Sequence, residues 1–140
     1  MSFDDDFKDR VLIRERMSTY ADTMFQQDLA GWLANFTEDC VWRGGALEYR
    51  GHAQLATSWP LLWEPLLKIG YFTEVAAIEV HGDHASARCY SRQIMFRKDG
   101  GVSKLVGLYR DQLVRSNGTW LFRLREFEAI GREAIVAPAA

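Results

Sequence analysis

The sequence predicts an α+β protein in which N-terminal helices pack into a strongly curved, mainly antiparallel sheet. Apolar residues recur at helical spacing near the start of the chain, whereas the chain after residue 71 consists of four strand-like runs. The turn sequences HGDH, KDGG and SNGT separate these runs, as in a meander of hairpins. Because a sheet must cover its apolar face and only the helices are available to do so, we expect a cavity between the two layers.

The first helix is expected over residues 4–27, since three aspartates in its first turn favour the positive end of the helix dipole. Asp28 is expected to end this helix and to cap a second one. The buried stripe of the first helix is predicted as Phe7, Val11, Ile13, Met17, Tyr20 and Met24, and that of the second as Leu29, Trp32, Leu33 and Phe36.

The rest of the chain alternates between strands and one more helical region. A strand is expected to begin at Cys40, and a second short one to cover Leu47–Arg50. Residues 51–70 are predicted as a third helical region, which two prolines interrupt. The four later strands are expected over residues 71–81, 85–97, 102–115 and 119–128, followed by a frayed tail over about residues 133–140.

Composition and charge exclude several classes of protein. The net charge is −2 and no basic run occurs, which argues against a nucleic-acid partner. Cys40 and Cys89 lack the spacing of a zinc site, and we expect two buried free thiols in a reducing compartment. The first ten residues lack the apolar stretch of a signal peptide, and no apolar run is long enough to cross a membrane. We therefore expect a cytoplasmic protein with no membrane contact and no bound metal.

Specific segments of the chain resemble a known family. These are Tyr20 and Asp28 in the first helical region, the turn FTED from Phe36 to Asp39, and the hairpin GLYRDQLVRSNGTW, in the order given. They are similar to the SnoaL-like polyketide cyclase group, which belongs with ketosteroid isomerase, scytalone dehydratase and nuclear transport factor. The resemblance covers roughly residues 13–127. It implies one SnoaL-like domain over residues 1–140, a cone-shaped α+β barrel and no cofactor, but the fold hosts unrelated chemistries.

The resemblance carries two catalytic candidates to this chain. Tyr20 falls where ketosteroid isomerases have a tyrosine that donates a hydrogen bond to the substrate oxygen. Asp111 falls where they have a protonated aspartate that shares this oxygen. The isomerase base falls at Gly44, which cannot transfer a proton, and the Asp–His dyad of scytalone dehydratase falls at Phe25 and Tyr71, so both dyad members are missing.

Both catalytic candidates have a structural alternative. Tyr20 lies on the apolar stripe of the first helix, which is also the place of a core tyrosine. Asp111 alternates with Tyr109 and Leu113 and is expected to point inward, where a carboxylate is costly unless it is paired or protonated. It either forms an ion pair with Arg123 or Arg125, or has a raised pKa that lets it donate a hydrogen bond.

Aromatic residues and one histidine are predicted to line the cavity. His52 follows Gly51 at a helix start, whereas His81 and His84 flank a hairpin turn and are expected to face solvent. The predicted substrate-binding set is Trp42, Tyr49, His52, Trp59, Trp63, Tyr71 and Tyr109.

Three functions remain open from the sequence. The first is a cofactor-free lyase, isomerase or hydratase that acts on a small cyclic apolar molecule through Tyr20 and Asp111. The second is a non-catalytic binding protein for such a molecule. The third is a partner similar to the small (beta) subunit of aromatic-ring-hydroxylating dioxygenases, which shares the fold. For all three we expect a homodimer through the outer sheet face, where apolar residues alternate at Tyr90, Ile94, Val106, Leu108 and Val114.

Overall fold

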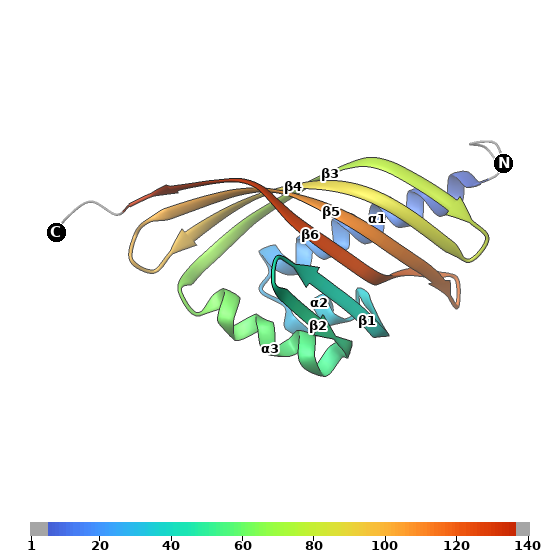
Figure 1. The fold of residues 1–140 in the computed structure, drawn as a ribbon, viewed down its shortest axis with the longest axis horizontal. Helices are drawn as coiled ribbons and strands as arrows, with labels where there is room; N and C mark the ends of the chain where they lie inside the picture. The colour runs from blue at the N-terminus through green and yellow to red at the C-terminus, as the bar shows by residue number, and fades with distance from the viewer. Residues whose placement is uncertain (1–5, 137–140) are drawn as a thin grey trace.

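Six strands form one curved sheet in the computed structural model, which describes residues 6–136 of the chain (Figure 1). The strand order is β2-β1-β6-β5-β4-β3, and β1 runs parallel to β6 while the other neighbouring pairs are antiparallel. The helices lie against the concave side of the sheet, as predicted. The sheet itself stays open between its edge strands β2 and β3. Its strands are β1 (Phe36–Gly44), β2 (Leu47–Arg50), β3 (Leu66–His81), β4 (His84–Arg97), β5 (Val102–Ser116) and β6 (Thr119–Ile135).

The first helix, α1 (Phe7–Phe25), follows the N-cap residue Asp6 and ends two residues before the predicted end. Asp4 and Asp5 lie outside the described residues, and the chain leaves the helix before Gln27, which has a positive φ of 53°. Ile13 is fully buried, as predicted. Val11 is 38% exposed and Phe7 is 54% exposed, contrary to the predicted stripe. At 100° per residue, Val11 lies about 200° around the helix from Ile13, so the two cannot share one face.

Asp28 is the N-cap of the short helix α2 (Leu29–Leu33), as predicted. The Asp28 carboxylate accepts a hydrogen bond from the Gly31 amide at 2.9 Å, which satisfies one free donor of the helix start. Phe36 was expected on this helix but begins β1, so the strand starts four residues earlier than predicted. Phe36 is nonetheless buried, because it packs against Trp32 with ring centroids 5.5 Å apart.

The third helix, α3 (Gly51–Trp63), is shorter than the predicted region of residues 51–70. Pro65 follows its end and β3 begins at Leu66, five residues before the predicted strand start. The longer strand pairs with β4 as far as Leu66 opposite Arg97. Composition could not separate helix from strand here, because an apolar run of this kind fits either element.

The four long strands form the predicted meander, and its end also differs from the prediction. β6 continues to Ile135, which pairs with Val102, so residues 133–135 belong to the sheet and not to a frayed tail. Residues 137–140 lie outside the described part of the chain. On the outer sheet face Tyr90 and Val106 are exposed as predicted, but Leu108, which lies between its register partners Tyr90 and Glu128, is only 7% exposed.

The remaining structural expectations concern the cysteines and the membrane. Cys40 and Cys89 are free thiols and both are buried, as predicted. Within residues 6–136, no helix combines the length and apolar character needed to cross a membrane. The same residues contain no group of three or more His, Cys, Asp or Glu side chains arranged to hold a metal ion.

Candidate functional site

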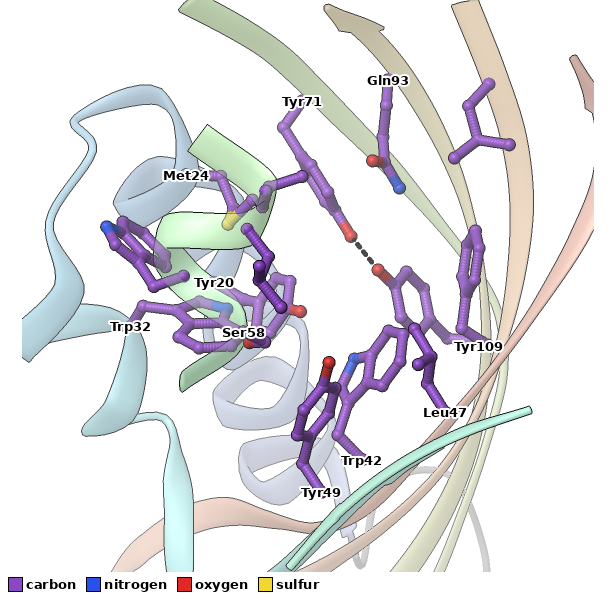
Figure 2. A pocket seen from close by; sticks show the side chains of 15 residues that line it. Tyr20, Met24, Trp32, Trp42, Leu47, Tyr49, Ser58, Tyr71, Gln93 and Tyr109 are labelled. Carbon is purple, nitrogen blue, oxygen red and sulfur yellow. Dashed lines mark hydrogen bonds between the residues drawn. The ribbon is translucent and has the colours of Figure 1, made fainter. Parts of the chain in front are cut away.

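An apolar cavity of about 380 Å³ opens between the helices and the inner sheet face (Figure 2). Helices α1, α2 and α3 contribute one side, and strands β1 to β6 contribute the other. The lining residues are Tyr20, Met24, Trp32, Trp42, Leu47, Tyr49, Ser58, Trp59, Leu61, Leu62, Tyr71, Gln93, Leu105, Tyr109 and Phe127.

Two tyrosine hydroxyls form the polar centre of this cavity. Tyr71 on β3 donates a hydrogen bond of 2.6 Å to the hydroxyl of Tyr109 on β5, and both hydroxyls point into the cavity (Figure 2). Both side chains are almost fully buried. Burial raises the pKa of each phenol well above its ordinary value of 10.0, so both stay protonated and act as neutral donors.

Tyr20 connects the cavity to the packed core behind it. It lies on α1 among a ring of aromatic side chains, with centroids 5.7 Å from Tyr71 and 6.1 Å from Tyr109. On its other face the guanidinium carbon of Arg125 lies 4.3 Å from the ring centroid. Tyr20 therefore lines the cavity and also packs in the core, and its role as a donor to a substrate oxygen stays a prediction.

Asp111 forms an ion pair with Arg125 and does not line the cavity. Nε of Arg125 donates to Oδ1 at 2.7 Å and Nη2 donates to Oδ2 at 3.0 Å, and both side chains have 0% exposure. Burial alone would lower the pKa of Arg125, but the Asp111 carboxylate raises it above its ordinary value. Burial raises the pKa of Asp111 above its ordinary value, while Arg125 acts in the opposite direction. The fork of two hydrogen bonds is the geometry of a charged pair, so the structure contains the predicted alternative with Arg125, and Asp111 is not a free acid at the cavity wall.

The cavity floor is a stack of aromatic rings that two glycines accommodate. Phe127 stacks on Trp42 with a centroid distance of 6.1 Å and packs on Tyr109 at 5.0 Å. A Cβ atom at Gly44 would lie 2.6 Å from Cη2 of Trp42, and one at Gly107 would overlap the Phe127 ring. The Trp42 ring thus occupies the space beside Gly44, where the resemblance placed an isomerase base.

His52 and Trp63 are the other predicted site residues that do not line the cavity. Nε2 of His52 lies 3.0 Å from the carbonyl oxygen of Phe36, so the ring joins α3 to β1. Trp63 is buried in the core and packs on Trp59 with centroids 5.7 Å apart. Of the predicted set, the structure brings to one cavity Tyr20, Trp42, Tyr49, Trp59, Tyr71 and Tyr109.

Gln93 is a cavity residue that the sequence analysis missed. It is 7% exposed on β4, and its amide nitrogen lies 3.4 Å from the hydroxyl of Ser91. Polar residues at inward positions of a strand are unusual, and Ser91 and Gln93 follow the inward Cys89 in alternation. That alternation was the signal available in the sequence.

The cavity wall offers hydrogen-bond donors but no group that ionises near neutral pH. No carboxylate, imidazole or amine is among the residues that line it. The indole nitrogens of Trp32 and Trp42 are buried donors without a partner in the described structure. Such a wall can bind a cyclic apolar molecule and polarise an oxygen on it, but it contains no side chain suited to remove a proton at neutral pH.

With a helical layer packed in an open curved sheet around such a cavity, the chain belongs to the SnoaL-like domain family, which matches residues 5–126. No curated protein sequence matches the chain significantly.

Solved structures with the same fold are similar over almost the whole chain. A scytalone dehydratase-like protein from Novosphingobium aromaticivorans has a TM-score of 0.88 at 20% identity, covering 99% of this chain and 95% of its own. A type 2 hexachlorocyclohexane dehydrochlorinase has a TM-score of 0.84 at 15% identity, covering 99% and 97%. A ketosteroid isomerase-like protein from Erwinia carotovora has a TM-score of 0.75 at 20% identity, covering 86% and 95%. At these identities the likeness establishes the fold.

Proposed function

We propose that this protein binds a small, cyclic and largely apolar molecule through one of its oxygens, and that it acts on it as a cofactor-free lyase or isomerase. The Tyr71–Tyr109 hydroxyl pair in an apolar cavity carries this proposal. One hydroxyl of the pair donates to the other, so one hydroxyl proton is left for a ligand oxygen; when Tyr71 donates to Tyr109, this is the proton of Tyr109.

The chemistry follows from what this hydroxyl pair can stabilise. A hydrogen bond from Tyr109 to a ring carbonyl stabilises the negative charge that develops on the oxygen when the neighbouring carbon loses a proton. That proton passes to a water molecule, since the cavity wall contains no base at neutral pH. In a conjugated dienolate, return of that proton from water to the far carbon completes an isomerisation. With a β-hydroxyl on the ring, transfer of that proton from water to the hydroxyl, which then leaves as water, completes an elimination.

The fold relationship supports the reaction class. A scytalone dehydratase-like protein, a hexachlorocyclohexane dehydrochlorinase and a ketosteroid isomerase-like protein share the architecture, and the names dehydratase, dehydrochlorinase and isomerase describe elimination and isomerisation reactions. The cavity volume of about 380 Å³ suits a ligand of one or two rings.

A matched pair of ligands tests the oxygen site. We expect 1-tetralone to bind more tightly than tetralin, its counterpart without the carbonyl. Tyr109→Phe should reduce this preference by between about twofold and about tenfold, the value of one net hydrogen bond. Tyr90→Phe is the control, because Tyr90 is an exposed tyrosine on the outer sheet face. Equal binding of both ligands, or an unchanged preference in Tyr109→Phe, contradicts the oxygen site.

Turnover is tested separately from binding. In D₂O, proton NMR should show protein-dependent loss of the hydrogens beside the carbonyl of 1-tetralone, and the exchange should slow in Tyr109→Phe. The second candidate function is a binding protein without turnover, and the absence of a base among the cavity residues favours it. Tyr109-dependent binding without hydrogen exchange supports this second candidate and rejects the first.

We also propose that two copies associate through the outer sheet face. Tyr90 and Val106 expose 39% and 43% of their surface there, and a second copy would cover them. Val106→Glu should give a monomer by light scattering, whereas Val11→Glu on the exposed side of α1 should leave the mass unchanged. A monomeric wild-type protein would reject this proposal.

A further inference from the structure

A buried cation lies directly behind the tyrosine pair of the cavity. Arg125 has 0% exposure, and its guanidinium carbon lies 3.8 Å from the ring centroid of Tyr109, 4.3 Å from that of Tyr20 and 4.2 Å from that of Phe122. Tyr20 and Tyr109 both line the cavity, whereas Arg125 does not. The charge is therefore separated from a bound ligand only by the rings that would contact it.

The position of this charge is fixed by a small set of contacts. Asp111 holds Nε and Nη2 of Arg125 in a fork of two hydrogen bonds, and Nη2 also approaches the sulfur of Met17 at 3.7 Å. Nη1 is buried without a partner in the described structure. Because Asp111 binds only one edge of the guanidinium, the charge is only partly neutralised towards the surrounding rings.

We propose that Arg125 is a positioning residue whose charge strengthens Tyr109 as a donor, so that the cavity prefers a ligand oxygen bearing negative charge, such as a phenolate or a cyclic enolate. This inference rests on the proposed function, because it needs Tyr109 to bind the ligand oxygen. It goes further in naming the charge state that the site selects and the residue that selects it.

The physical basis is the attraction between a cation and an aromatic face. A guanidinium held against the Tyr109 ring favours electron density moving away from the hydroxyl oxygen, which makes the O–H a stronger donor. The titratable groups that face Arg125 are Tyr20, Tyr71, Cys89, Tyr109 and Asp111. Burial raises the pKa of Tyr71, Tyr109 and Cys89, and Arg125 acts in the opposite direction on all three.

The wild-type protein provides the first test, with 4-nitrophenol as the probe. Its phenol and phenolate forms absorb at different wavelengths, so the charge state of the bound probe is read directly during a pH titration. We expect the bound probe to ionise at a lower pH than the free probe. A bound probe that ionises at the same or a higher pH overturns the inference, whether or not any variant folds.

Two variants with opposite expected signs assign the effect to Arg125. Asp111→Asn removes the counter-charge and keeps the cation, so the preference for phenolate should increase. The double variant R125M/D111L replaces both charges by apolar groups of similar size, a change that buried ion pairs often tolerate. It should weaken the phenolate preference about tenfold, equivalent to a rise of about one unit in the pKa of the bound probe.

The control pair lies at the surface and joins β6, the strand of Arg125, to β1. Arg123 and Asp39 approach to 3.8 Å and are exposed by 53% and 71%, so R123Q/D39N should leave the titration of the probe unchanged. Shifts of the same sign in Asp111→Asn and in the double variant would indicate a merely structural effect and reject the role of Arg125. If 4-nitrophenol and 1-tetralone both fail to bind, the proposed function fails; if they bind through Tyr109 without charge selection, only this inference fails.

Discussion

The inner face of the sheet has two halves that differ in packing and in charge. In the closed half, Met17, Tyr20, Asp111 and Phe122 surround Arg125 without a gap that reaches the solvent. In the open half, the cavity is lined by aromatic and aliphatic side chains, and its polar groups are uncharged. Tyr20 and Tyr109 form the boundary, because each has the cavity on one side and the guanidinium on the other.

This difference shows where the protein keeps its buried charge. A carboxylate and a guanidinium are paired in the closed half, where neither can touch a ligand. In the open half, the charge of this pair acts on a bound ligand only through the rings of Tyr20 and Tyr109. A site of this kind can favour negative charge on a ligand without presenting a charged side chain to it.

The largest expected effect comes from breaking the pair in the closed half. Arg125→Met should lower the free energy of unfolding by about 3–5 kcal/mol, because Asp111 is left as a buried and unpaired carboxylate. The double variant R125M/D111L should recover most of this loss. Urea denaturation followed by far-UV circular dichroism measures both values.

The exposed ion pair between Arg123 on β6 and Asp39 on β1 is the matched control for this prediction. R123Q/D39N should change the stability by less than about 1 kcal/mol, since exposed ion pairs contribute little. If Arg125→Met is as stable as the wild type, Asp111 is protonated or hydrated in the variant. The closed half then does not hold a buried and unpaired carboxylate.

The next effect concerns the floor of the open half. Gly107→Ala places a methyl group where the Phe127 ring lies, so the ring must move towards the cavity or the strands must separate. We expect a loss of about 1–3 kcal/mol in stability, as for other overpacked sites, together with weaker binding of 1-tetralone.

Gly131→Ala is the control for this substitution, because a Cβ atom there meets nothing within 4 Å. It should leave both stability and binding nearly unchanged. Weaker binding in Gly107→Ala at unchanged stability would show that the ring moves into the cavity. Equal behaviour of the two variants would mean that Phe127 does not limit the cavity.

The sequence predicted the arrangement of the chain better than the contacts of single side chains. Helical spacing and hairpin turns are local signals, and they predicted the helical stripe from Ile13 to Met24 and the meander of the last four strands. They did not predict that β1 lies parallel to β6. The end of α3 was missed, since the apolar run after it fits a helix or a strand equally well. Only the contacts between β5 and β6 decide that Asp111 meets Arg125 and not Arg123: Asp111 pairs with Arg125 in register, and both point inward.

The candidate site was predictable to the extent that inward residues follow from alternation along strands. Tyr71 and Tyr109 were both predicted, but their hydrogen bond joins β3 to β5 across β4, and no local pattern indicates such a contact. His52 shows the converse case. Its place at a helix start suggested the cavity, whereas its ring is used to join α3 to β1.

The smallest predicted effect is a pH dependence that both halves share. Burial raises the pKa of Cys40 and Cys89 above the ordinary value of 9.0, and that of Tyr71 and Tyr109 well above 10.0. The folded state therefore keeps these protons at a pH where the unfolded chain releases them. The resulting stability is fully present below about pH 8 and is lost as the pH rises through the ordinary pKa of the thiols and then that of the phenols.

We expect the free energy of unfolding to fall by about 1–2 kcal/mol between about pH 8 and about pH 10, measured by urea denaturation at each pH. In C40A/C89A the fall should begin at higher pH, because only the phenols remain to ionise. Tyr90→Phe should leave the curve unchanged, as Tyr90 is exposed. A free energy of unfolding that stays level to about pH 10 would show that these groups ionise at the same pH in the folded and the unfolded chain. Water would then reach both halves of the inner face, and the two halves would differ only in charge.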